Sequence, residues 1–433
     1  MESISYLTYL GVVVLLGLAC SVISKKIAVP NILLLIFTGI FLNKFWDIIN
    51  GGVFFFQKLG FIKSYTPYLS GPLIFFPPLF IAILALLALV MIVFESTSKF
   101  KYKDLDDFSL SALKLTIVFF AVNFAILSIL TNLLFGLENI FLAGLFAALM
   151  SGTASDVVMS MIKETKNEVI KLLEIESIFN TPLIVIIPFL ILELISNIGF
   201  LSSSIIISKL IEQLIPFLQQ FITGIGAGVV IGLAAVKILR EQHSHVLSPL
   251  ALISAALLTY ILAENLGGNG VLAVTAMGFI FGNMALKDKG HIQEFSKIFS
   301  IFLELVVFIL IGLLIDVPMT FSFLSKSFVL FLIFLLIRLI AVEVALLKNN
   351  YTFKEKLFMS LVVPKGIATA VVAVSLIGNQ LSGMETILDL TLIFIVYSIV
   401  LASGVLKFSK FFINLKLVDD RDTVRKSVFK KSK

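Results

Sequence analysis

Long apolar stretches alternate with short polar breaks along the whole chain. A helix needs about 20 mostly apolar residues to cross the hydrocarbon core of a bilayer, and runs of this kind predict thirteen membrane-spanning helices. The predicted spans cover residues 4–24, 29–45, 73–95, 109–135, 139–162, 168–196, 213–238, 246–265, 268–286, 297–315, 321–347, 357–379 and 386–412. We therefore expect one transmembrane domain over residues 1–413 and a short basic tail over 414–433.

The composition agrees with this pattern and excludes a water-soluble enzyme. Apolar residues make up 59% of the 433 residues and charged residues only 14%, against roughly a quarter charged in soluble domains. The mean hydropathy of +1.10 leaves too little polar material to cover several soluble domains. The unbroken apolar runs are typical of helices and not of outer-membrane barrel strands. The chain is thus expected to be an all-α polytopic membrane protein.

Basic residues between the predicted spans indicate the orientation. Lys and Arg are enriched in cytoplasmic loops, and 25 of the 33 fall on the side of the C-terminus while five fall on the other. This predicts a multi-pass protein of the cell membrane with its N-terminus outside and its C-terminus in the cytoplasm. Three basic residues, Lys114, Arg338 and Lys365, are left within spans. Nucleic-acid binding is not expected, because the densest basic stretch is the tail and not a folded face.

Two spans are interrupted by polar and helix-breaking residues. The fifth passes through residues 151–156 and the twelfth through Pro364-Lys365-Gly366. If the seventh span is a linker, spans 1–6 and 8–13 form two inverted repeats with both interruptions at matching positions. Such a pattern indicates the midplane substrate site of a secondary transporter. The alternative is that these are ordinary kinks, which membrane helices tolerate.

Ionisable residues gather at and beside the first interruption. Because a charge at the centre of a membrane helix costs about 2.5–3.5 kcal/mol on insertion scales, such residues are functional candidates. The candidate ligands on the fifth and sixth spans are Thr153, Ser155, Asp156, Glu176, Ser177, Asn180 and Thr181. This set offers oxygen atoms without thiolate or imidazole, which suits a hard cation.

A carboxylate in such a site can hold either a proton or a cation, so a site that opens to one side at a time is an exchanger. The alternative is that Asp156 and Glu176 neutralise Arg338 and Lys365 in structural ion pairs. Most other acids lie at span ends or lack a polar neighbourhood. Glu304 stands out, because it lies well inside a Leu-, Val- and Phe-rich span.

At these residues the sequence resembles the NhaP-type branch of the monovalent cation/proton antiporters, in the sodium/hydrogen exchanger superfamily. Members carry Thr-Asp-Pro on one broken helix and Glu-Ser-Leu/Ile-Phe-Asn-Asp on the next, where this chain has Ser155-Asp156-Val157 and, over residues 176–181, Glu-Ser-Ile-Phe-Asn-Thr. Phe94-Glu95 and Pro364-Lys365-Gly366 resemble the family's Phe-Glu-Gly and Pro-Arg-Gly stretches. Arg338 falls where the family places an arginine that pairs with the motif glutamate.

The resemblance implies a thirteen-helix fold with a dimer domain and a six-helix core domain, in a homodimer within the lipid bilayer. It implies exchange of Na+ or K+ for H+ by alternating access, without a cofactor, and leaves the choice of cation open. The cation is expected at Asp156, Glu176 and Thr181, with Arg338, Lys365 and Glu95 as structural or gating charges. An enzyme is not expected, because the spans contain no nucleophile and base pair and no metal-binding cluster.

One departure from the family pattern bears on function. The final aspartate of the second motif, taken to bind the cation and the exchanged proton, is Thr181 here. Threonine can ligate a cation, but it cannot carry a proton at cellular pH. The exchange carboxylate must then be Asp156 or Glu176, and Asp156 is favoured if Glu176 is tied to Arg338. The alternative is a proton-uncoupled cation pathway or an ion sensor on an antiporter scaffold.

Overall fold

The computed structural model describes residues 2–27, 31–43, 78–102, 107–154, 158, 167–198, 203–241, 247–285, 289–314, 318, 320–376 and 381–413. Secondary structure within these ranges is helical. The helices are α1 (Glu2–Ile27), an unlabelled helix (Asn31–Asn43), α3 (Pro78–Ser98), α4 (Asp107–Phe135), α5 (Ile140–Leu149), α7 (Glu168–Ile198), α8 (Ser203–Glu241), α9 (Leu247–Asn265), α10 (Gly270–Asn283), α11 (Lys289–Leu314), α12 (Phe321–Ala345), α13 (Phe353–Leu361), α14 (Ile367–Leu376), α15 (Met384–Lys407) and α16 (Ser409–Phe412).

The prediction of an all-α polytopic membrane protein is confirmed. Among the described residues, eight helices are long and apolar enough to cross a membrane. Four shorter apolar helices fall in further predicted spans: Asn31–Asn43, Ile83–Ser98, Ile140–Leu149 and Gly270–Asn283. The exact number of thirteen spans and the division into inverted repeats stay predictions, and the predicted tail at 414–433 lies outside the described residues.

Both predicted interruptions are present as breaks in the helices. α5 ends at Leu149, after which the chain runs without regular structure to Ala154. α13 ends at Leu361 and α14 begins only at Ile367. The two irregular segments lie side by side, and the backbone N–H of Ala154 donates to the carbonyl of Pro364 at 2.8 Å. We call this meeting point of the two broken spans the crossing. This contact joins parts of the chain that are more than 200 residues apart.

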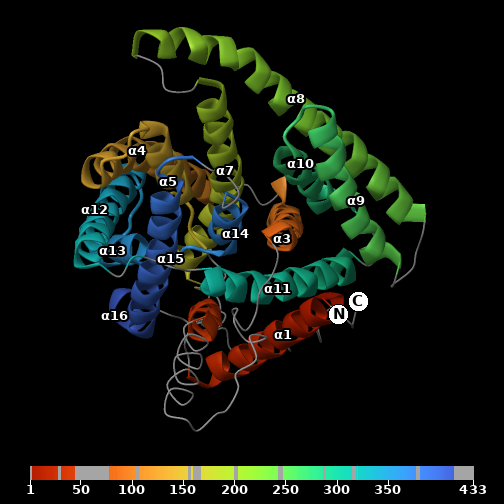
Figure 1. Ribbon diagram of the computed structural model, residues 1–433, viewed down its shortest axis with the longest axis horizontal. Coiled ribbons are helices and arrows are strands. Elements are labelled where there is room, and N and C mark those ends of the chain that lie inside the picture. Colours follow the sequence, from red (N-terminus) through yellow and green to blue (C-terminus); the bar gives the residue numbers. More distant parts are fainter. Residues whose placement is uncertain are drawn as a thin grey trace, which may run out of the picture.

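The helices around this crossing fall into groups that Figure 1 separates clearly. α4, α5, α12 and α15 lie together on one side of the molecule, and α8, α9 and α10 lie on the other. α3, α7 and α14 lie between the two groups, while α1 and α11 run below them. The crossing is therefore placed among helices from distant parts of the sequence.

Aromatic rings fill the interior of the first group. Phe331, Phe334 and Phe394 come from α12 and α15, and all three are at most 4% exposed. Phe394 meets Phe146 of α5 edge to face, with ring centroids 5.0 Å apart, and Phe334 meets Phe119 of α4 at 5.9 Å. Such tilted and edge contacts are the favoured arrangements of aromatic pairs. They fix α4, α5, α12 and α15 relative to one another.

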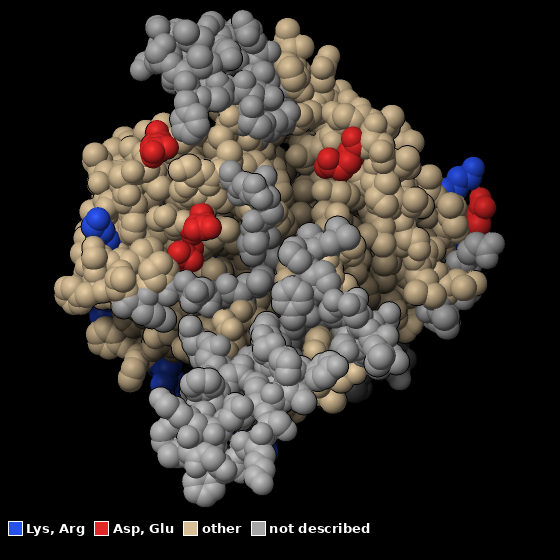
Figure 2. All heavy atoms as spheres, in the orientation of Figure 1, with Lys and Arg blue, Asp and Glu red and all other residues tan. Residues whose placement is uncertain are grey.

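The outer surface is apolar, as a lipid environment requires. Large apolar side chains are exposed on several of the long helices, for example Leu15, Leu133, Val230 and Leu336. Figure 2 shows one face of the molecule, on which few of the described side chains are charged. These helices are therefore solvated by hydrocarbon over much of their surface.

Candidate ion-binding site

Lys365 holds the crossing of the two broken spans together. Its Nζ atom donates to the carbonyl oxygens of Met150 and Gly152, each at 2.6 Å. It also lies 4.4 Å from the centre of the Phe334 ring, and the residue is 0% exposed. Met150 caps the C-terminus of α5, where carbonyl oxygens lack helical partners and the helix dipole is negative. The buried ammonium group therefore satisfies the carbonyls that the break in α5 exposes.

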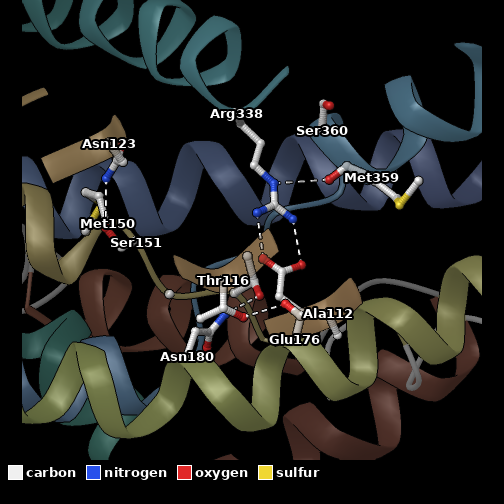
Figure 3. A network of polar contacts seen from close by, with 12 residues as sticks. Ala112, Thr116, Asn123, Met150, Ser151, Glu176, Asn180, Arg338, Met359 and Ser360 are labelled. Carbon is white, nitrogen blue, oxygen red and sulfur yellow. Dashed lines mark hydrogen bonds and ion pairs between the residues drawn. The ribbon is translucent and has the colours of Figure 1, made fainter. Parts of the chain in front are cut away.

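Glu176 of α7 forms a buried ion pair with Arg338 of α12, the pairing that the family resemblance implies. The guanidinium donates through Nη1 and Nη2 to the two carboxylate oxygens at 2.6 and 2.7 Å, and both side chains are 0% exposed. Arg338 also donates from Nε to the carbonyl of Met359 at 3.4 Å and stacks 4.5 Å from the Phe119 ring centre. Figure 3 shows the side chains of Glu176 from α7 and Arg338 from α12 pointing at each other. Both carboxylate oxygens are thus engaged.

Asn180 and Thr181 continue α7 one turn further on. Asn180 donates from Nδ2 to Thr153 Oγ1 at 2.6 Å, while its own Oδ1 is buried without a hydrogen-bond partner. Asn180 is labelled in Figure 3, one helical turn from Glu176. Thr181 Oγ1 donates to the carbonyl of Ser177 at 2.7 Å. Pro182 follows and cannot donate to the carbonyl of Ile178, which leaves that oxygen available.

A cavity of about 90 Å³ lies beside the crossing. Its polar lining residues are Glu95, Ser96 and Lys99 of α3, Thr153 of the first break, Glu174, Ser177 and Thr181 of α7, Glu304 of α11 and Thr369 of α14. The lining also includes Ile178 and Gly366. Hydroxyl, carboxylate and backbone oxygens therefore surround a space large enough for a cation with a few water molecules.

The structure brings some of the sequence-predicted residues together and separates others. Thr153, Ser177, Thr181 and Glu95 line the cavity, and Asn180 is linked to it through Thr153. Glu176 does not line it, because its carboxylate is turned to Arg338. Ser155 and Asp156, the residue favoured for exchange, lie outside the described residues.

Other cavity residues were missed or set aside by sequence reasoning. Thr369 carries no signal of its own beyond its place shortly after Pro364-Lys365-Gly366, and Glu304 was noted only for its apolar surroundings. Glu95 forms an ion pair with Lys99 one turn later at 2.6 Å, so the carboxylate and the ammonium share the cavity wall. Among the described residues, no three His, Cys, Asp or Glu side chains converge to hold a metal ion.

Two broken spans that cross beside an oxygen-lined cavity, in a polytopic helical protein, define a membrane transporter of the secondary active class. Residues 11–409 match the family described as "Sodium/hydrogen exchanger, transmembrane". The chain therefore belongs to the sodium/hydrogen exchanger family, and the resemblance read from its motifs is confirmed.

Individual relatives agree with this assignment. The chain is 26% identical over 396 residues to Na(+)/H(+) antiporter 1 of Methanocaldococcus jannaschii, which covers 87% of this chain and 84% of the relative. It is 24% identical over 381 residues to the K(+)/H(+) antiporter NhaP of Alkalimonas amylolytica, and this match covers 86% of this chain and 61% of the relative. The solved structure of the sodium proton antiporter MjNhaP1 from Methanocaldococcus jannaschii matches with a TM-score of 0.72 at 22% identity, covering 94% of this chain and 97% of that chain. This structural match supports the fold.

Proposed function

We propose that this protein is a secondary active transporter that exchanges a monovalent cation, Na+ or K+, for H+ across the cell membrane by alternating access. Membership of the sodium/hydrogen exchanger family supports the proposal, as do relatives named as Na+/H+ and K+/H+ antiporters. The observation that carries it is the cavity beside the crossed breaks, which is lined by Thr153, Ser177 and Thr181. We further infer a homodimer with the N-terminus outside and the C-terminus in the cytoplasm.

In this proposal Asp156 is the carboxylate that carries the exchanged proton. Glu176 is bound through both of its oxygens to Arg338, and a threonine at 181 cannot carry a proton. Asp156 follows three residues after Thr153, which lines the cavity. The role of Thr153, Ser177 and Thr181 is to offer neutral oxygen ligands, and Glu176 with Arg338 fixes α7 against α12.

A carboxylate that exchanges one proton for one monovalent cation moves no net charge across the membrane. The exchange is then driven by the ion gradients alone, and each pH unit supplies about 1.4 kcal/mol. The uncoupled pathway or ion sensor, which the threonine at 181 suggested, is not favoured, because the family and the relatives are exchangers. The choice between Na+ and K+ belongs to experiment, since relatives of both kinds match.

The exchange carboxylate is tested with the purified protein in proteoliposomes that contain a pH-sensitive dye. We expect addition of Na+ or K+ to dequench the dye with the wild-type protein and not with Asp156→Asn, because an amide cannot carry the proton. Glu138→Gln is the matched control, since this exposed residue precedes α5 and lies one position before the predicted fifth span. Exchange by Asp156→Asn at the wild-type rate and affinity would contradict the assignment.

A further inference from the structure

We propose that Glu304 and Thr369 complete the binding site of the transported cation, by supplying a carboxylate and a hydroxyl oxygen from α11 and α14. The inference rests on the proposed function, because it names further ligands for the same cation. It assigns to α11 the carboxylate that is missing from position 181 of α7. The ligand class is a monovalent alkali cation, for which oxygen ligands are suited.

Glu304 reaches the cavity from the interior of a long helix. It lies near the middle of the 26-residue helix α11, and Thr181 lies near the middle of the 31-residue helix α7. Both line the same cavity, together with Thr153 from the break after α5. A carboxylate in the middle of an apolar helix is costly, so it is a functional candidate, and here it lines the same cavity as two threonine side chains.

Glu304 is better placed for this role than the other carboxylates near the crossing. Glu95 stands only three residues before the end of α3, and Glu174 is only the seventh residue of α7. Glu176 is bound to Arg338 and turned away from the cavity. Among the described carboxylates that line the cavity, Glu304 is therefore the one that lies furthest from the ends of its helix.

Thr369 supplies an independent observation. Several buried threonines within the helices, such as Thr181 and Thr391, donate their hydroxyl to the carbonyl four residues earlier. Thr369 is 0% exposed, and its Oγ1 has no hydrogen-bond partner. The residue four positions before it, Lys365, belongs to the irregular segment and not to a helix. Buried hydroxyl groups are normally satisfied, so an unsatisfied one that lines a cavity points to an occupant of that cavity.

The break in the twelfth span thus has two separate effects. Lys365 turns to the carbonyls of Met150 and Gly152 and closes the crossing, while Thr369, one turn on, is left with a hydroxyl for the cavity. α14 contacts both α11 and α7, so it can hold that hydroxyl between Glu304 and Thr181. The cation would be bound between Glu304 of α11, Thr369 of α14 and Thr181 of α7.

Cation binding is measured by the thermal unfolding of the purified protein in detergent, titrated with Na+ or K+ against choline. A ligand that binds the folded state raises the unfolding temperature. We expect Glu304→Gln to raise the cation concentration for half-maximal stabilisation about tenfold or more, because a charged ligand is lost. Thr369→Val should raise it several-fold, and Thr369→Ser, which restores the hydroxyl, should return it to the wild-type value.

Glu294→Gln is the control for the charge, because Glu294 is exposed on the same helix and does not line the cavity. Glu304→Asp keeps the charge, so its cation concentration for half-maximal stabilisation should lie between those of the wild-type protein and Glu304→Gln. Unchanged cation affinity in both Glu304→Gln and Thr369→Val, or a wild-type protein that no monovalent cation stabilises, would overturn the inference. Cation binding without any proton exchange in vesicles would overturn the proposed function and leave these two ligands standing.

Discussion

The buried side chains of Glu176 and Lys365 have different kinds of partner, and the partner decides what each residue can do. Glu176 faces Arg338, and Lys365 faces two backbone carbonyls. The structural ion pair that sequence reasoning allowed for Glu176 is present, while Lys365 satisfies the end of a broken helix. Charge alone therefore could not distinguish a residue that stabilises the fold from one that binds the cation.

The buried Glu176–Arg338 ion pair should contribute to the stability of the fold. Removing one partner of a buried ion pair leaves the other charge uncompensated, which costs about 3–5 kcal/mol. We expect Glu176→Gln to lower the unfolding temperature and the yield of folded protein strongly. Glu343→Gln is the matched control, because Glu343 lies on α12 with Arg338 and its ion pair with Lys356 of α13 is only partly buried. Exposed pairs are worth about 0–1 kcal/mol.

The double variant Glu176→Met with Arg338→Met removes both charges and should recover much of the lost stability, since apolar replacements of a buried pair are often tolerated. Unfolding in detergent is the measurement. Equal effects of Glu176→Gln and Glu343→Gln would show that the buried pair does not stabilise the fold.

Individual site residues were predictable only where a motif marked them. Thr153, Ser177 and Thr181 stand beside the polar breaks, and the structure places them on the cavity. Glu304 and Thr369 could not be assigned in this way, because hydropathy gives the position of a residue along its helix but not which helix it faces. Their place in the site depends on the packing of α11 and α14 against α7.

At the scale of the helices, the sequence located the spans well and their ends less well. α11 begins at Lys289, eight residues before the predicted span, and α8 begins at Ser203, ten residues before. The physical reason is that the bilayer rule counts apolar residues, whereas a helix continues through polar turns such as those around Lys209 and Glu294. Both breaks were predicted correctly, because glycine, proline and polar residues interrupt the apolar runs there.

α8 and α10 pack so closely that an added side chain at their contact should destabilise the protein. A Cβ atom at Gly228 of α8 would lie 2.1 Å from the carbonyl oxygen of Ala273 in α10, whereas one at Gly226 would have nothing within 4 Å. We expect Gly228→Ala to force the helices apart and to destabilise the protein by about 1–3 kcal/mol, as overpacking does. Gly226→Ala should be neutral or stabilising by up to about 1 kcal/mol, since alanine favours a helix.

Thermal unfolding of the two alanine variants in detergent measures this difference. The variants differ by two positions on one helix and carry the same substitution, so helix propensity alone would change both in the same direction. A Gly228→Ala protein as stable as Gly226→Ala would show that α8 and α10 do not pack as closely as described.

At the scale of the whole molecule, the fold joins distant parts of the chain at one site. The cavity draws on the helix Asn31–Asn43, α3, α7, α11, α14 and the break after α5, so its lining residues run from 32 to 369 in the sequence. The apolar exterior keeps these helices in lipid, while the polar groups gather inside. An alternating-access transporter needs this arrangement, because the ion leaves water and must bind at a polar site inside the protein that is shielded from lipid.

Coupling of cation transport to proton transport is tested by following both fluxes at the same time. Wild-type protein in proteoliposomes is given a Na+ or K+ gradient, and cation uptake and internal pH are followed together. We expect one proton to leave for each cation that enters, and the rate to stay unchanged when a voltage is held across the membrane. Cation uptake without proton movement would contradict it and identify an uncoupled pathway.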